Sequence, residues 1–94
     1  MRVAWTQRAL ADLQSVREYV TEFNRVAAAT LVERIVMASH RLVDHPHIGR
    51  PARVAGTREL IVPRTPYLLP YRVRGQTVEI LRVYHGARRW PKTL

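Results

Sequence analysis

The chain has 94 residues, no cysteine and a formal net charge of +9, from 16 Lys and Arg against 7 Asp and Glu. This length predicts one domain over residues 1–94, and the lack of cysteine excludes a disulfide framework and a cysteine-based metal site. No apolar run approaches the roughly 20 residues that cross a bilayer, and the first residues contain no apolar signal-peptide core. We therefore expect a cytoplasmic protein without a membrane partner.

The positive charge is concentrated in the second half of the chain. Residues 1–45 carry six Arg and five acids, whereas residues 46–94 carry nine Arg and Lys92 against two acids. An Arg-favouring genome explains the choice of Arg over Lys but not this asymmetry. Arginine offers a planar fork that pairs with phosphate or carboxylate and stacks on bases. The second half therefore predicts a surface for nucleic acid, for a nucleic-acid-bearing machine or for an acidic protein.

The first half predicts a short strand over residues 2–5 and two helices. Apolar residues at three- and four-residue steps predict helices over 6–22 and 25–43, with Thr6 and Asn24 as caps. The two apolar stripes are Leu10, Leu13, Val16, Val20 and Phe23, then Ala28, Leu31, Ile35, Ala38 (or Ser39) and Leu42. A connection of about two residues forces the helices into an antiparallel hairpin.

A long basic loop is predicted over residues 44–57, which are rich in proline and glycine. The apolar period then changes to two and predicts three strands, with a tight turn at residues 75–76. These strands are 58–62, 67–74 and 77–84. Pro70 cannot donate to a ladder, so its strand either has a bulge there or lacks a partner on one side. Neither face of the last strand is wholly apolar, so its inner face is not evident.

The order of elements is β-α-α-β-β-β. Both helical stripes are buried only if the hairpin packs on one face of a small, mostly antiparallel sheet. We therefore expect an α+β fold with the other sheet face partly open.

The sequence carries no strong enzyme signature, because it has no Gly-rich phosphate loop and no Ser-centred elbow. His45 and His47 flank Pro46, but two imidazoles alone in a loop make a weak metal site. We expect no metal and no cofactor.

His85 is the titratable group of greatest interest. An imidazole can serve as an acid or a base near neutral pH, and several arginines could stabilise phosphoryl charge if they converge around it. These are Arg58, Arg72, Arg82, Arg88 and Arg89. The alternative is that His85 hydrogen-bonds the chain where it turns out of the sheet.

Five segments together resemble the RelE/ParE superfamily of bacterial toxins, over nearly the whole chain. They are W-T-x-x-A-x-x-D-L (5–13), G-R-P (49–51), T-R-E-L (57–60), Y-L-L-P-Y-R-V (67–73) and I-L-R-V-Y-H-G-A-R-R-W-P (80–91). The family fold implied is two N-terminal helices on an antiparallel sheet. The resemblance also implies a toxin neutralised by a small acidic antitoxin, which alone binds operator DNA. Expected antitoxin contacts are Leu31, Ile35, Leu42, Arg50 and Arg53.

The superfamily divides by target. RelE-like and YoeB-like members cut mRNA on the ribosome without a metal, whereas ParE-like members poison DNA gyrase. If this chain is a nuclease, His85 is the acid or base, Arg58 and Arg88 hold the scissile phosphate, and Tyr84 stacks on a base.

The chain departs from the nuclease pattern, which favours the ParE-like branch. Its sheet has no lysine, Leu68 stands where the nucleases carry an arginine, and Gly86 stands where the YoeB-type members end in tyrosine. The nine residues after His85 also resemble the longer tail of ParE-like toxins. Expected target contacts are Arg58, Arg64, Arg72, Arg82, His85, Arg88, Arg89 and Trp90. A non-toxic binding module that keeps the fold is the third possibility.

Overall fold

The computed structural model describes residues 1–87, so Arg88, Arg89 and Trp90 lie outside the described residues. The elements in chain order are β1 (Arg2–Trp5), α1 (Gln7–Thr21), α2 (Arg25–Asp44), β2 (Arg50–Pro51), β3 (Arg58–Ile61), β4 (Tyr67–Arg74), β5 (Thr77–Ile80) and β6 (Tyr84–His85). No helix in this part of the chain is long and apolar enough to cross a membrane.

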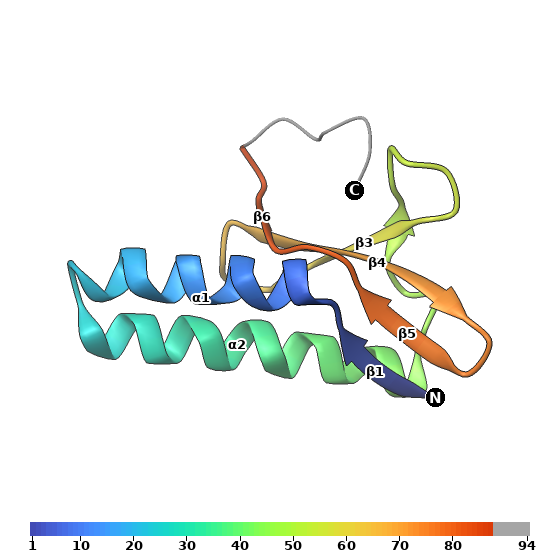
Figure 1. Cartoon of the computed structure of the whole chain (residues 1–94), viewed down its shortest axis with the longest axis horizontal. Coiled ribbons are helices and arrows are strands. Elements are labelled where there is room, and N and C mark those ends of the chain that lie inside the picture. The colour runs from blue at the N-terminus through green and yellow to red at the C-terminus, as the bar shows by residue number, and fades with distance from the viewer. Residues whose placement is uncertain (88–94) are drawn as a thin grey trace.

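Side-chain caps start both helices where the sequence predicts them. The Thr6 hydroxyl accepts the backbone N–H of Ala9 at 3.2 Å, and the Asn24 side-chain oxygen accepts that of Ala27 at 2.9 Å. These bonds satisfy N–H groups that have no partner within the helix. The short connection after Thr21 returns the chain as an antiparallel hairpin, whose far end lies well beyond the sheet (Figure 1).

The strands form one sheet of order β1-β5-β4-β3-β2, with β6 also paired to β4. The β1–β5 pair is parallel and the other pairs are antiparallel. The hairpin covers one face of this sheet (Figure 1). The predicted α+β architecture is therefore confirmed, with a small correction. The predicted loop contains the two-residue strand β2, which pairs with β3.

The core lies between the hairpin and the sheet. Its helical side chains are Ala9, Ile35, Ala38 and Leu42, and its sheet side chains are Leu60, Val62, Leu69, Tyr71, Val78, Ile80 and Val83. Alternation along β4 sends Tyr71 into this core and sends Arg72 and Arg74 to the opposite, open face.

The last strand is broken by a one-residue bulge. Tyr71 of β4 pairs with Ile80, whereas Leu68 of β4 pairs with Tyr84. Two residues of β4 (69–70) thus face three residues of the last strand (81–83), which is the count of a β-bulge. The backbone N–H of Leu81 donates to the carbonyl of Pro70 at 2.8 Å. The bulge therefore lies opposite this proline, on the last strand, and not on the strand that contains Pro70, where it was expected.

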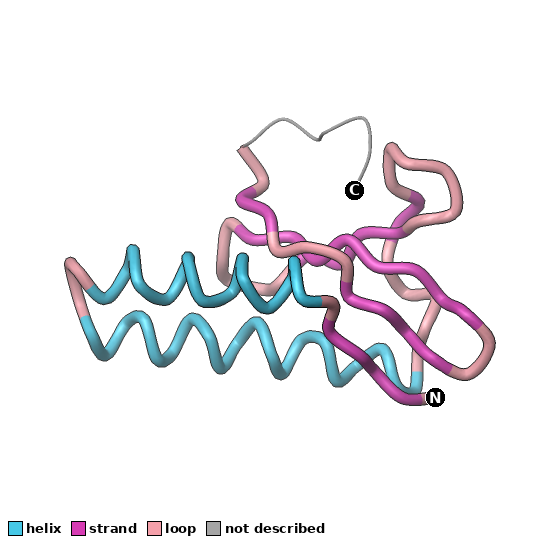
Figure 2. Tube along the Cα trace, in the orientation of Figure 1, coloured by secondary structure: helices cyan, strands magenta, loops and turns pink. Residues whose placement is uncertain are grey.

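The continuous strand predicted over residues 77–84 is therefore wrong. Figure 2 shows loop where the sequence predicts strand, between β5 and β6. The bulge shifts the alternation by one residue, and Val78, Ile80 and Val83 are all buried. Because the buried positions change from even-numbered to odd-numbered residues at the bulge, neither set of alternate residues in 77–84 is wholly apolar.

Tyr71 ties the segment that follows α2 to the sheet. Its side chain is fully buried. Its hydroxyl accepts the backbone N–H of Gly49 at 2.9 Å and donates to the carbonyl of Pro46 at 2.8 Å. Burial raises the pKa of the Tyr71 phenol, although the Gly49 hydrogen bond and the Arg58 charge act in the opposite direction.

Tyr71→Phe is expected to lower the free energy of unfolding by about 1–3 kcal/mol at neutral pH, because it leaves a buried donor and acceptor unpaired. The neutral phenol is favoured in the folded state, so its contribution is complete below about pH 10 and is lost as pH rises through the raised pKa. The variant should therefore lose stability less steeply than the wild type above that pH. Urea unfolding across the alkaline range measures both effects, and parallel alkaline slopes in the two proteins would contradict the assignment.

Candidate functional site

His85 lies on β6 in a fixed turn. Its ring is half-buried and meets the ring of Tyr67 edge-on, with centroids 5.5 Å apart. His85 Nδ1 accepts the backbone N–H of Ala87 at 3.1 Å, and Gly86 donates its own N–H to the carbonyl of Pro66 at 2.6 Å. The neutral ring therefore carries its proton on Nε2. These contacts indicate that His85 stabilises the turn by which the chain leaves the sheet.

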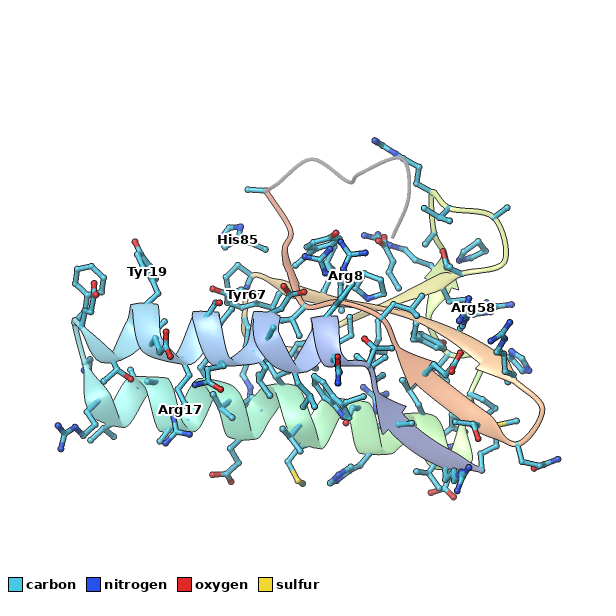
Figure 3. The ribbon with its side chains drawn as sticks, viewed as in Figure 1. Arg8, Arg17, Tyr19, Arg58, Tyr67 and His85 are labelled. Carbon is cyan, nitrogen blue, oxygen red and sulfur yellow. The ribbon has the colours of Figure 1, made fainter. Side chains whose placement is uncertain are left out.

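Arg58 does not lie beside His85. Arg58 is opposite Tyr71 across β3–β4, whereas His85 is opposite Tyr67 across β4–β6. Those two positions on β4 are four residues apart, or about 13 Å along the strand, and Figure 3 shows the two side chains at different ends of the sheet. The Arg58 guanidinium instead donates to the carbonyl of Gly49 at 2.8 Å.

The other expected target contacts are dispersed. Arg64 lies in the β3–β4 connection with a positive φ of 61°. Arg72 donates to Glu79 at 2.7 Å on the open face of the sheet. Arg82 is turned to α1, and its guanidinium also lies 4.9 Å from the ring of Tyr84. The described part of the expected set does not converge on one phosphate-sized point.

Asp12 on α1 is a key residue that the sequence analysis missed. Its carboxylate accepts two hydrogen bonds from Arg82, at 2.7 and 3.1 Å, and the backbone N–H of Val83 at 3.0 Å. The hydrogen bond that Arg82 donates to Asp12 raises the pKa of the Arg82 guanidinium against the effect of burial. Asp12 thus holds the bulge that leads into β6, together with Thr6, whose hydroxyl donates to the carbonyl of Leu81 at 3.1 Å. The partners are seventy residues apart in sequence, and no local pattern links them.

Two expected antitoxin contacts are corrected by the packing. Ile35 and Leu42 are fully buried in the core and present no surface to a partner. Leu31 is half-buried and packs against that core. Arg50 is exposed and pairs with the buried carboxylate of Glu59, and Arg53 is exposed in the loop after β2.

The structure contains a groove between the two helices, which the apolar stripes of the sequence did not predict. Its volume is about 980 Å³. Leu10, expected inside, is 51% exposed and lines the groove with Ala29 and Val32. Phe23, also expected inside, is 74% exposed at the hairpin tip, where its ring meets that of Tyr19 at 5.3 Å. Figure 3 shows Tyr19 directed away from the hairpin.

The charged side chains along this groove are of both signs, and they include Arg17, Glu18, Glu22 and Arg25. An apolar floor with charged edges suits the apolar face of an amphipathic helix. Within residues 1–87 no group of three or more His, Cys, Asp or Glu could hold a metal ion.

Comparison with known proteins identifies the family. A relative in Sinorhizobium fredii, Y4kP, whose name classes it as a toxin, is 42% identical over 93 residues, covering 99% of this chain and 96% of the relative. Toxin RelE2 of Caulobacter vibrioides is 41% identical and covers 93% of this chain and 97% of its own length.

A solved structure with a similar fold supports the same family. A chain of the chromosomal ParDE TA system from P. aeruginosa matches with a TM-score of 0.81 and 35% identity, covering 90% of this chain and 95% of that one. The family model of the ParE toxin of the type II toxin–antitoxin system parDE matches residues 3–90. This chain therefore belongs to the ParE toxin family of type II toxin–antitoxin systems.

Proposed function

We propose that this toxin acts on DNA gyrase by binding and not by cutting RNA. The observation that carries the proposal is the separation of Arg58 from His85, because a metal-free ribonuclease needs its acid–base group and its phosphate-binding cations around one scissile bond. Leu68, where a nuclease would carry an arginine, supplies no charge and is buried. A gyrase-directed toxin acts in the cytoplasm.

A supercoiling assay tests this proposal. Purified toxin, freed of antitoxin, is expected to stop gyrase from supercoiling relaxed plasmid. The His85→Ala variant should inhibit as well as the wild type, because binding needs no proton transfer. Unaffected supercoiling at saturating toxin would contradict the proposal.

Ribosome-dependent mRNA cleavage is the second candidate function. The half-buried ring of His85 beside Tyr67 favours it, since both side chains suit an RNA site. It predicts codon-positioned cuts in translated mRNA that disappear in His85→Ala. Primer extension on mRNA from growth-arrested cells detects such cuts, and toxicity that survives His85→Ala argues against this candidate.

The inter-helix groove is the proposed docking surface for a helix of the neutralising antitoxin. Its floor includes the exposed side chains of Leu10 and Ala29, and association would remove this apolar surface from water. The acidic character expected of an antitoxin complements the chain's net charge of +9 and speeds encounter.

Ala29→Trp is expected to weaken antitoxin binding by on the order of 30-fold or more, because the indole occupies the groove where the partner's anchor residues pack. Thr30→Trp is the matched control, since residue 30 is the next, exposed position of α2 and does not line the groove. Calorimetric titration of each toxin with antitoxin gives the two affinities. Equal losses in both variants would place the helix of the antitoxin elsewhere.

A further inference from the structure

A second cavity, of about 590 Å³, lies apart from the inter-helix groove and shares no lining residue with it. It is enclosed by the start of α1, the end of β4 and the segment 54–57 that precedes β3. Of the target and antitoxin contacts expected from the sequence, Arg72 lines this cavity.

The cavity gathers positive charge from separate parts of the chain. Arg8 reaches it from α1, and Arg72 and Arg74 reach it from β4. No carboxylate is among its lining residues in the described part of the chain. The first turn of α1 contains no acid, so the positive end of the helix dipole adds to the field of Arg8. An anion in the cavity would be attracted by these charges, although Glu79 offsets part of the charge of Arg72.

The arginines of β4 have donors available for such an anion. Arg72 uses its Nε to pair with Glu79, and a guanidinium carries five N–H donors. Arg74 is exposed at the end of β4. The two side chains leave the same face of the strand, about 7 Å apart at their Cα atoms, which allows them to bind two neighbouring oxyanions or the two sides of one.

The walls of the cavity indicate which class of anion it accepts. Val54, Ala55 and Leu81 contribute apolar surface, and no aromatic side chain of residues 1–87 lines the cavity. Single-stranded nucleic acid is typically held by aromatic stacking together with positive charge. Arginines beside aliphatic walls instead match a peptide in which acidic and aliphatic side chains are close together.

We propose that this cavity, the arginine pocket, binds an acidic segment of the antitoxin, with carboxylates on Arg8, Arg72 and Arg74 and an aliphatic side chain against Val54 and Leu81. The inference rests on the proposed neutralisation by an acidic antitoxin. The antitoxin then contacts two separate surfaces, one with a helix in the inter-helix groove and one with this segment. Part of its affinity should therefore depend on salt.

The test measures the affinity of the toxin for its cognate antitoxin at low and high salt. Arg8→Gln/Arg74→Gln is compared with Arg34→Gln/Arg41→Gln, which removes the same charge from exposed positions on α2. Arg72 is kept, because its removal would leave Glu79 without its partner. The pocket variant should bind about 30-fold more weakly at low salt and lose most of its salt dependence, with less than about threefold change in the control. Equal affinities in the two variants would overturn the inference.

A second variant and a second probe make each outcome decisive. If the double variant does not fold, Arg74→Gln alone replaces it, since this exposed side chain supports no described element. Fluorescence anisotropy with a short DNA duplex is the second probe. Duplex binding that is lost in the pocket variant, with antitoxin affinity unchanged, would assign the pocket to phosphodiesters and overturn the peptide assignment. A wild type that neither binds antitoxin nor arrests growth would refute the proposed function itself.

Discussion

Gly49→Ala is expected to lower the free energy of unfolding by about 3 kcal/mol or more, because a methyl group has no room at this position. An added Cβ would lie 2.6 Å from Cε1 and 2.7 Å from the hydroxyl of Tyr71, and 2.8 Å from the carbonyl oxygen of Glu59. The tyrosine ring is fully buried and the carbonyl belongs to β3. Neither can move without disturbing the sheet, and the total stability of such a domain is only about 5–15 kcal/mol.

Gly56→Ala is the matched control for this prediction. Nothing lies within 4 Å of a Cβ added there, and the position is strained only by its φ of +77°. Its expected cost is about 1–2 kcal/mol. Urea unfolding of the two variants beside the wild type measures the difference. A Gly49 variant as stable as the Gly56 variant would show that the close approach of Tyr71 and the 46–49 segment does not constrain the fold.

Asp12→Ala is expected to destabilise the protein by about 3 kcal/mol, through the loss of the only side chain that binds both Arg82 and the backbone of the bulge within the described residues. The two charged side chains are 19% and 20% exposed, so water replaces part of the lost interaction. The value therefore lies at the low end of the range for a broken ion pair. Asp12→Asn should cost less, because an amide oxygen can still accept the Val83 N–H.

The control for Asp12→Ala is Glu33→Ala, which removes the same charge from an exposed position of α2. Thermal unfolding gives the stabilities. Amide NMR of residues 81–87 should shift in Asp12→Ala and remain unchanged in the control, because the bulge leads directly into β6 and His85. If both variants unfold at the same temperature, the Asp12–Arg82 pair is not what holds this segment.

The sequence predicted the helices well because their determinants are local. Thr6 and Asn24 are capping residues that act on the next turn of the chain, and both helices begin after them as expected. The apolar period likewise located β4 to the residue. These features require only neighbours within about four positions.

The incorrect predictions have a different origin, because each of these features depends on a residue that is distant in sequence. The bulge at 81–83 lies opposite Pro70 on the neighbouring strand, and the helical stripe of Ile35 does not reveal whether a sheet or an antitoxin covers it. The set proposed around His85 failed for Arg58 because the distance between them is fixed by strand register. Register is a property of pairs and not of either strand alone.

The part of the hairpin beyond the sheet has a consequence for how the toxin is regulated. None of residues 14–27 is buried, although Val16 packs against the edge of the core. The second half of α1 and the first turn of α2 therefore have little tertiary support, and helices that lack a tertiary partner are marginal in water. This end of the molecule should open locally far more often than the sheet does. A partner helix in the groove would complete a three-helix layer there. If the antitoxin places a helix there, binding and the last step of folding at this end of the toxin are one event, and the free toxin is the form more exposed to proteases.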